Sequence, residues 1–221
     1  MQGGMIMKRL LALGLFLALT NRCAAQEIPA PPKPDAVFPE WQAVTDTPTA
    51  QKLFAPMDGS RKVERRPDGA VLLPVNFKGT THARVSWDLR IKTDLRLTRG
   101  VQFDFYCSDL TPFSSFSLYF RSGGGWYHAS FSPEKTGVWE HIVIDKADAP
   151  GESTVAGWGA VDMLRLSGWR CLSTDTVCAI ANLGPVDVAP EVLVIRADSS
   201  AKKQKPNEGF ALYAGTVSST L

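Results

Sequence analysis

The sequence predicts a mainly β protein, an antiparallel β-sandwich or jelly roll, from three observations. Apolar and polar residues alternate with period two in several short segments. Clusters of Gly, Pro, Ser and Asp separate these segments, and no convincing helical pattern lies between them. Such alternation is typical of antiparallel sheets with one buried and one solvated face, and many short strands of this kind indicate a sandwich or jelly roll.

The N-terminal segment has the features of a secretory signal peptide. Lys8-Arg9 precede ten apolar residues, Leu10–Leu19, and small residues stand before Gln26. Ten residues form a helix only about 15 Å long, which is too short to span a bilayer. We therefore expect a signal peptide over residues 1–25, cleavage after Ala25, no membrane span, and an exported protein in the periplasm or outside the cell.

The charge balance excludes some partners. Loss of the signal peptide would leave 21 basic and 22 acidic residues, so nothing favours binding to nucleic acid or to an anionic membrane. Three histidines and no cysteine pair at zinc-site spacing argue against a structural zinc. No cofactor is expected. The fold class allows a structural calcium ion, to which no residues can be assigned.

Three cysteines would remain after cleavage, and an odd count in an exported protein leaves one thiol free or intermolecular. Cys171 and Cys178 bracket "LSTDTV", which looks like a loop between strands, so a disulfide between them is predicted. Cys107 ends a strand pattern and is expected to be a small buried hydrophobe. A lipoprotein acylated on Cys23 is the alternative to simple cleavage, and Asn21-Arg22 are poor neighbours for that reaction.

The elements follow in chain order. Residues 26–45 are proline-rich and are expected to be an extended linker, and residues 46–190 hold the sandwich. In residues 84–91, for example, Val85 and Trp87 share one face and Ser86 and Asp88 the other. The predicted strands cover residues 70–77, 84–91, 100–107, 115–120, 139–145, 163–169 and 177–183.

The pattern changes after residue 190. "VLVIRAD" (192–198) is a continuous apolar run, typical of a strand buried on both faces, and residues 207–221 carry apolar residues at helical spacing behind Asn207, a fair N-cap. One strand and one helix cannot bury both of their faces. We therefore expect residues 191–221 to be the start of a truncated α/β domain, whose missing C-terminal part would be a partner of the sandwich.

A hairpin is predicted at "SGGGWYHASF" (122–131). A two-residue turn at Gly123-Gly124 sets Arg121 opposite Trp126 and Tyr119 opposite His128. The inner face then holds apolar residues and the outer face aromatic and polar ones, whereas a three-residue turn would mix the two.

The outer face of this hairpin is the best candidate for ligand binding. Sugar rings stack their C–H faces on aromatic planes and offer hydroxyls to Asp, Arg and His. The candidate ligand-binding residues are Tyr119, Arg121, Trp126 and His128, extended by Asp104 and Tyr106 if strand 100–107 lies beside strand 115–121. A second interpretation stays open, in which Arg121 stacks on Trp126 and Tyr119 lies beside His128 only to stabilise the sheet.

Catalytic residues are not expected. No pair of carboxyls has a recognisable spacing for a glycosidase, and no GxSxG, HExxH or phosphate-binding glycine loop occurs. Trp139, Trp158 and Trp169 are interpreted mainly as packing residues. Whether the chain is an enzyme stays uncertain, and we expect that it is not.

Several segments carry a resemblance to a known kind of protein. "RGVQFDFYCSD", "SSFSLYFRSGGGWYHASF", "WEHIVIDKAD", "GWGAVDMLRLSGWR" and "VLVIRADSSA" resemble the N-terminal part of secreted bacterial multidomain proteins. In these, a galactose-binding-like jelly roll akin to carbohydrate-binding modules precedes an α/β domain similar to the β-galactosidase trimerisation domain. The resemblance covers about residues 40–221 and supplies no catalytic residues.

The resulting hypothesis is an exported, non-catalytic, carbohydrate-binding-like module, accessory to polysaccharide or glycoside processing by a longer parent protein. The first alternative is a module that packs against another domain and has no affinity for sugar. The second is a polysaccharide lyase on a jelly roll, for which Tyr119 or His128 would be the base and Arg121 would neutralise the substrate acid.

Overall fold

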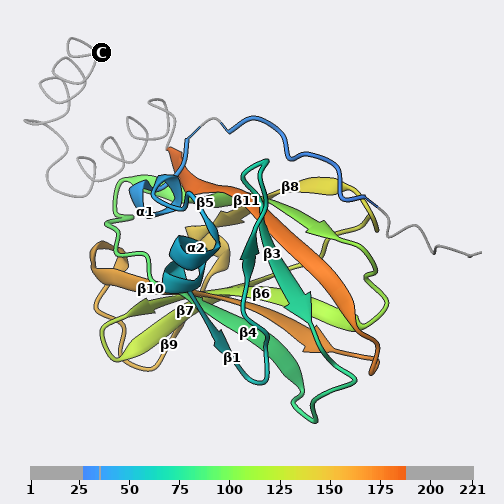
Figure 1. Cartoon of the computed structure of the whole chain (residues 1–221). Coiled ribbons are helices and arrows are strands. Elements are labelled where there is room, and N and C mark those ends of the chain that lie inside the picture. Colours follow the sequence, from blue (N-terminus) through green and yellow to red (C-terminus); the bar gives the residue numbers. More distant parts are fainter. Residues whose placement is uncertain (1–26, 35, 188–221) are drawn as a thin grey trace, which may run out of the picture.

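Two antiparallel β-sheets pack face to face in the computed structural model, which describes residues 27–34 and 36–187 (Figure 1). The six-stranded sheet has the order β1-β4-β10-β6-β7-β9, and the five-stranded sheet has the order β2-β3-β11-β5-β8. The prediction of a mainly β antiparallel sandwich is thus confirmed. The expected signal peptide (1–25) and α/β segment (191–221) lie outside the described residues.

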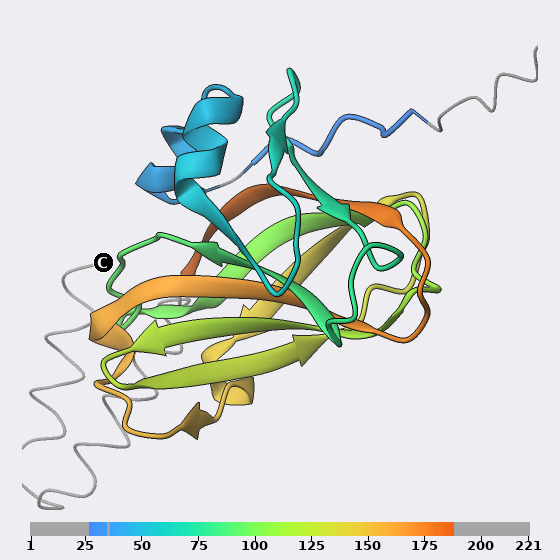
Figure 2. The same cartoon turned by 60° about the horizontal axis from the view of Figure 1, so that its bottom comes forward.

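Two short helices precede the strands and lie together on one side of the sandwich (Figure 2). Among the described residues, no helix is long and apolar enough to cross a membrane. The elements are α1 (Pro39–Gln42), α2 (Thr47–Leu53), β1 (Phe54–Met57), β2 (Glu64–Arg65), β3 (Val71–Val75), β4 (Arg84–Leu89), β5 (Thr98–Cys107), β6 (Phe113–Ser122), β7 (Gly125–Phe131), β8 (Trp139–Asp145), η1 (Lys146–Asp148), β9 (Gly151–Glu152), η2 (Trp158–Ala160), β10 (Val161–Arg170) and β11 (Thr176–Asp187).

All seven predicted strands occur, as β3, β4, β5, β6, β8, β10 and β11. The hairpin register is also confirmed, because Arg121 pairs with Trp126 and Tyr119 with His128 across β6 and β7. Strands β1, β2 and β9 and both α-helices were not expected. Strands β2 and β9 have only two residues each, too few to show an alternation of apolar and polar residues.

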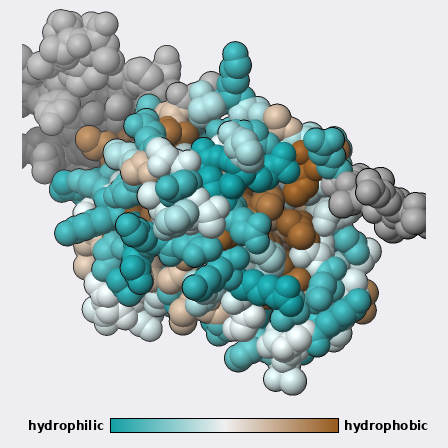
Figure 3. Space-filling view, viewed as in Figure 1, coloured by the Kyte–Doolittle hydropathy of each residue, from teal (hydrophilic) through white to brown (hydrophobic). Residues whose placement is uncertain are grey.

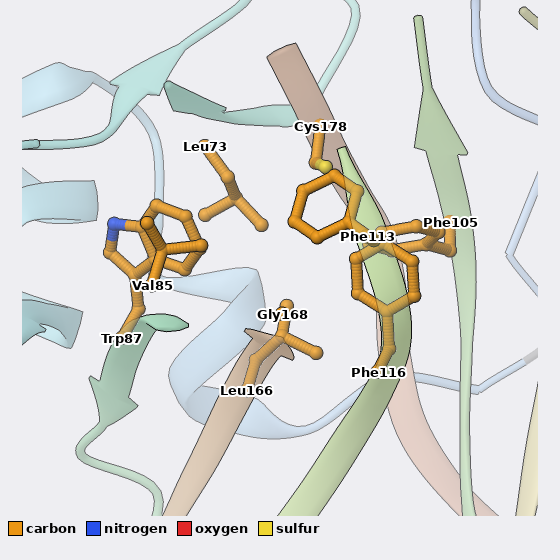
Figure 4. Close-up of a pocket in the computed structure, with 9 residues that line it drawn as sticks. All are labelled: Leu73, Val85, Trp87, Phe105, Phe113, Phe116, Leu166, Gly168 and Cys178. Atoms are coloured by element: carbon orange, nitrogen blue, oxygen red, sulfur yellow. The ribbon is translucent and has the colours of Figure 1, made fainter. Parts of the chain in front are cut away.

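The core lies between the sheets and is built from the inward residues of the alternating strands. Trp87, Phe105 and Phe120 are at most 2% exposed. Figure 4 shows the interior near one end, where Leu73, Val85, Phe116 and their neighbours converge and leave no room for a water molecule. Outside, hydrophilic residues cover most of the face seen in Figure 3, and hydrophobic ones gather beside β3 and β11.

Part of the expected linker packs against the sandwich. Phe38, Trp41 and Val44 are buried, and the Phe38 N–H donates to the carbonyl of Leu183 in β11 at 3.0 Å. Helix α2 begins with a capping box, in which the Asp46 carboxylate accepts from the Thr49 N–H at 2.8 Å. Residues 37–45 are therefore an ordered part of the sandwich and not a free linker.

The predicted disulfide is not formed, and Cys107, Cys171 and Cys178 are all free thiols in the structure. Cys178 is buried and lies directly opposite Cys107 on β5, whereas Cys171 is exposed just after β10. The expected disulfide between Cys171 and Cys178 is therefore not present. The physical reason is that Cys178 points into the core, while Cys171 lies on a solvent-facing turn.

Candidate functional site

The outer face of the six-stranded sheet carries the predicted hairpin residues. Tyr119 and Arg121 lie on β6, and Trp126 and His128 lie on the adjacent β7, all half-buried. Because residues of one strand alternate between faces, the inward neighbours Leu118, Phe120 and Ala129 are buried in the core. The structure thus brings together four of the six predicted ligand-binding residues, and we call these four the hairpin face.

Aromatic contacts join the hairpin face. Tyr119 stacks on His128, with ring centroids 5.4 Å apart and planes at 22°, and meets Trp126 edge-on at 6.3 Å. The Nδ1 atom of His128 lies 3.2 Å from the Glu152 carboxylate of β9, at an angle that does not form a hydrogen bond. The predicted contact of Tyr119 with His128 is confirmed.

The cation over Trp126 comes from a residue that the sequence did not single out. The guanidinium of Arg165 on β10 lies 4.7 Å from the centroid of the Trp126 ring. Arg165 also donates to both carboxylate oxygens of Asp88 on β4, at 2.5 and 3.0 Å. The expected stacking of Arg121 on Trp126 is therefore corrected to Arg165, which reaches the ring from the other side of β6.

Arg121 is engaged in a separate ion pair. It donates to both oxygens of Asp162 at 2.7 and 3.0 Å. This hydrogen bonding lowers the pKa of the Asp162 carboxyl below its usual value, and hydrogen bonding to Asp88 raises the pKa of Arg165. Each guanidinium thus has its charge compensated by a carboxylate of the domain itself.

A shallow depression of about 400 Å³ lies beside these pairs. Its lining combines one tryptophan, one tyrosine, one histidine and four serines. Trp169, at the end of β10, was interpreted as a packing residue but is half-buried in this wall, with its indole N–H 3.3 Å from the Ser117 hydroxyl. The lining residues are Ser114, Ser115, Ser117, Tyr119, His128, Ser130 and Trp169.

A sequence signal for Trp169 existed. In β10 the residues Leu164, Leu166 and Gly168 are buried, so the alternating positions Arg165 and Trp169 point to the outer face. What the sequence did not show was that β10 lies next to β6, because this pairing joins strands about 45 residues apart.

Asp104 and Tyr106 lie on the opposite side of the molecule. Strand β5 pairs with β11 and β8 and not with β6, so the condition for their extending the hairpin face is not met. The buried Asp104 carboxylate contacts His141 Nδ1 at 3.0 Å and accepts from the Asn182 amide at 2.6 Å. Tyr106 is fully buried beside Trp139, and its hydroxyl has no hydrogen-bond partner among the residues that the structure describes.

An N-terminal segment crosses this second face, and we call residues 27–34 the strap (Figure 1). Three of its carbonyls accept hydrogen bonds from side chains of the domain. Trp139 donates to Pro29 at 2.9 Å, Asn182 to Pro32 at 2.7 Å, and Arg66 to Ile28 at 2.7 Å. A cavity of about 260 Å³ remains beside the strap, lined by Pro32, Lys33, Pro34, Ala36, Gln102, Asp104, His141 and Asn182.

Trp139 was interpreted mainly as a packing residue, but it lies half-buried on this outer face. Trp158 packs against the core as expected, with its ring stacked on Tyr127 at 4.0 Å. Within the described part of the chain, no group of three or more His, Cys, Asp or Glu side chains could hold a metal ion.

No protein-family model and no curated protein matches the chain. Solved structures are similar to it in fold. An exo-beta-agarase has a TM-score of 0.45 at 13% identity, covering 66% of this chain. A carbohydrate-binding module specific for non-crystalline cellulose has a TM-score of 0.45 at 14% identity, covering 69% of this chain and 94% of the module.

A third similar structure is the family 11 carbohydrate-binding module of Clostridium thermocellum in complex with a β-1,3-1,4-mixed-linked tetrasaccharide. Its TM-score is 0.41 at 11% identity, with 61% of this chain and 88% of the module covered. The chain spans 25% of the agarase. Carbohydrate-binding modules are thus among the solved structures to which the chain is similar, at TM-scores below 0.5. At these identities the ligand must be argued from the chain's own residues.

Proposed function

We propose that the sandwich is a non-catalytic carbohydrate-binding module that holds a polysaccharide in the depression beside the hairpin face. The observation that supports this most directly is the composition of the depression, in which Tyr119, His128 and Trp169 alternate with the hydroxyls of four serines. Aromatic planes suit the C–H faces of sugar rings, and hydroxyl and imidazole groups exchange hydrogen bonds with sugar hydroxyls. The openness of the depression suits a chain that passes across it.

Internal pairing of the charges fits this proposal better than it fits catalysis. Asp88 and Asp162 are each locked to an arginine, so neither is a free acid or base for glycoside hydrolysis. A lyase would need Arg121 to neutralise a substrate carboxylate, and Asp162 already occupies it. The lyase alternative is therefore disfavoured.

The proposal includes an accessory role in a longer parent protein, exported after removal of residues 1–25. Such a module would keep a processing domain close to its polysaccharide. Stacking on aromatic rings and hydrogen bonding to hydroxyls do not need a calcium ion.

The rival proposal is a packing module without affinity for sugar. It is favoured by the same internal ion pairs, because Arg121 and Arg165 do not need a ligand to satisfy their charge. In that case the depression would bind another protein surface and no glycan.

Affinity electrophoresis tests the two proposals. The purified protein is run through gels that contain mixed-linked β-glucan, agarose, β-1,4-galactan or soluble cellulose derivatives, the glycans suggested by the similar structures. We expect retention in at least one gel. Tyr119→Ala and Trp169→Ala should each weaken binding about fivefold, since loss of one ring stack costs roughly 1 kcal/mol.

Trp139→Ala is the matched control, because Trp139 is an equally half-buried aromatic residue on the opposite face. It should leave retention unchanged, and far-UV circular dichroism should show the same fold for all variants. No retention in any gel would overturn the proposal and leave the packing module. An equal loss of retention in Trp139→Ala and Trp169→Ala would show that the depression is not the binding site.

A further inference from the structure

Two cysteines lie side by side on the core-facing side of the five-stranded sheet, on two neighbouring inner strands. Cys107 on β5 and Cys178 on β11 are directly paired in the register, and their sulfur atoms lie 3.4 Å apart. Both are at most 2% exposed. Figure 4 shows the Cys178 side chain pointing into the interior toward Phe113. The two sulfurs therefore share one enclosed site.

The strand geometry at this site suits a covalent bond. The next residue pair, Ser108 and Val177, is hydrogen-bonded, because the Ser108 N–H donates to the Val177 carbonyl at 3.0 Å. Hydrogen-bonded and non-hydrogen-bonded pairs alternate along antiparallel strands, so Cys107 and Cys178 form a non-hydrogen-bonded pair, with Cα atoms about 4.5 Å apart. This lies within the usual disulfide range of about 4.4–6.8 Å.

We propose that Cys107 and Cys178 form a cross-strand disulfide in the mature protein. The bond would join two adjacent strands of the five-stranded sheet and link two positions that are 71 residues apart in the sequence. The inference does not depend on carbohydrate binding, because the sulfurs lie in the core and away from the hairpin face.

Both sulfurs are buried in the folded domain, so an external oxidant reaches them before the two strands close over them. Within the folded site, a hydrogen bond from the Cys178 thiol lowers the pKa of Cys107, while burial raises the pKa of Cys178 well above its usual value. In the partly folded chain, the Cys107 thiolate would attack a sulfur of an external disulfide, such as oxidised glutathione or the active site of a thiol oxidase, and release one thiol. Cys178 then loses its proton and attacks the Cys107 sulfur, which forms the new bond and releases the second thiol.

Cys171 provides the matched control. It is exposed and lies only seven positions before Cys178, so it is the residue that the sequence alone would choose as the partner. The proposal assigns it a free thiol that reagents can reach in the folded protein.

Mass spectrometry separates the alternatives. The full chain is purified, unfolded and reduced, refolded in a buffer with reduced and oxidised glutathione, alkylated in denaturant and cleaved before aspartates. This cleavage gives separate peptides for the three cysteines, since Asp175 lies between Cys171 and Cys178. We expect peptide 104–108 linked to peptide 175–186, two hydrogens lighter than the reduced pair, with Cys171 alkylated. Alkylation of both Cys107 and Cys178, or a link to Cys171, would overturn the proposal.

Thermal unfolding supplies a second measurement. Closure of a loop this long predicts that dithiothreitol lowers the unfolding midpoint by roughly 10 °C. The shift should disappear in Cys107→Ala and persist in Cys171→Ser. If mass spectrometry finds the disulfide but the unfolding midpoint is the same with and without dithiothreitol, the bond does not stabilise the domain. If the shift is lost in Cys171→Ser, the disulfide does not join Cys107 and Cys178.

Discussion

The Arg165 guanidinium lies over the indole of Trp126 while its Nε and Nη2 atoms donate to the two carboxylate oxygens of Asp88. Asp88 is 7% exposed, so this carboxylate relies on Arg165 to replace the water it lost on folding. The ion pair between Arg165 on β10 and Asp88 on β4 therefore holds a guanidinium against the Trp126 ring of the hairpin face.

Asp88→Asn should destabilise the domain. The substitution keeps the shape but removes the charge from a nearly buried, bidentate pair, and hydrogen bonds to charged groups contribute about 1.5–3 kcal/mol. We expect the free energy of unfolding in urea to fall by about 2 kcal/mol. The matched control is Asp162→Asn, whose exposed pair with Arg121 should change stability by less than about 1 kcal/mol. Equal losses in both variants would show that burial of Asp88 is not the cause.

Arg121→Gln should move the titration of Asp162. The Arg121 guanidinium holds the pKa of this carboxyl below its ordinary value of 3.8, so removal of the guanidinium should raise the pKa toward that value. A depressed folded-state pKa adds stability above the unfolded value, and this stability is lost as the pH falls through the folded pKa. The parent protein should therefore lose a small amount of folding stability as the pH falls below about 4, and the variant should lack this loss.

The Asp162 pKa can be measured by a carboxyl carbon titration followed by NMR. An Asp162 pKa that is the same in both proteins would show that the Arg121 guanidinium does not hold it down. Arg96→Gln is a suitable comparison, since its partner Asp94 has a pKa of about 2 at a separate exposed site and Asp162 should not respond to it.

The strands and the hairpin could be predicted because their information is local. Alternation in β4 or β6, and the glycines between Ser122 and Gly125, depend only on neighbours in the chain. Pairing between strands that are distant in the sequence produces no such local pattern of residues. The placement of β5 beside β11, and of β10 beside β6, decided that Asp104 and Tyr106 lie away from the hairpin face.

The same limit explains the cysteines and the tryptophans. A loop of six residues suggested Cys171 as the partner of Cys178, whereas the paired residue, Cys107, comes from a strand far away in sequence. Trp169 and Trp139 both looked like packing residues. Whether an aromatic residue at a strand end is covered depends on which segment of the chain crosses it. The proline-rich sequence of the strap did not indicate that it packs against the five-stranded sheet.

Ser86 and Ser167 offer a test of pairing between β4 and β10. Both are fully buried, and their hydroxyls lie 2.9 Å apart. Replacing one serine by alanine leaves the other hydroxyl without its partner, which costs about 1–3 kcal/mol. The double variant removes both groups and should be more stable than the sum of the single losses by about 1 kcal/mol. Urea unfolding of the four proteins measures this coupling, and additive losses would argue against a hydrogen bond between the two hydroxyls.

Gly184→Ala should release the N-terminal segment from the five-stranded sheet. An added Cβ at this position would overlap the carbonyl of Ala36, and a backbone atom cannot give way as a flexible side chain does. Tyr106 is fully buried although it points to the outer face of β5, and we ascribe this burial to the strap, which is hydrogen-bonded to its neighbour Trp139. We therefore expect hydroxyl-radical footprinting to modify Tyr106 in the variant but not in the parent protein. Gly124→Ala is the control, since its Cβ would come no closer than 3.6 Å to another atom. If Tyr106 stays protected in Gly184→Ala while the alanine is tolerated, the strap is not what covers it.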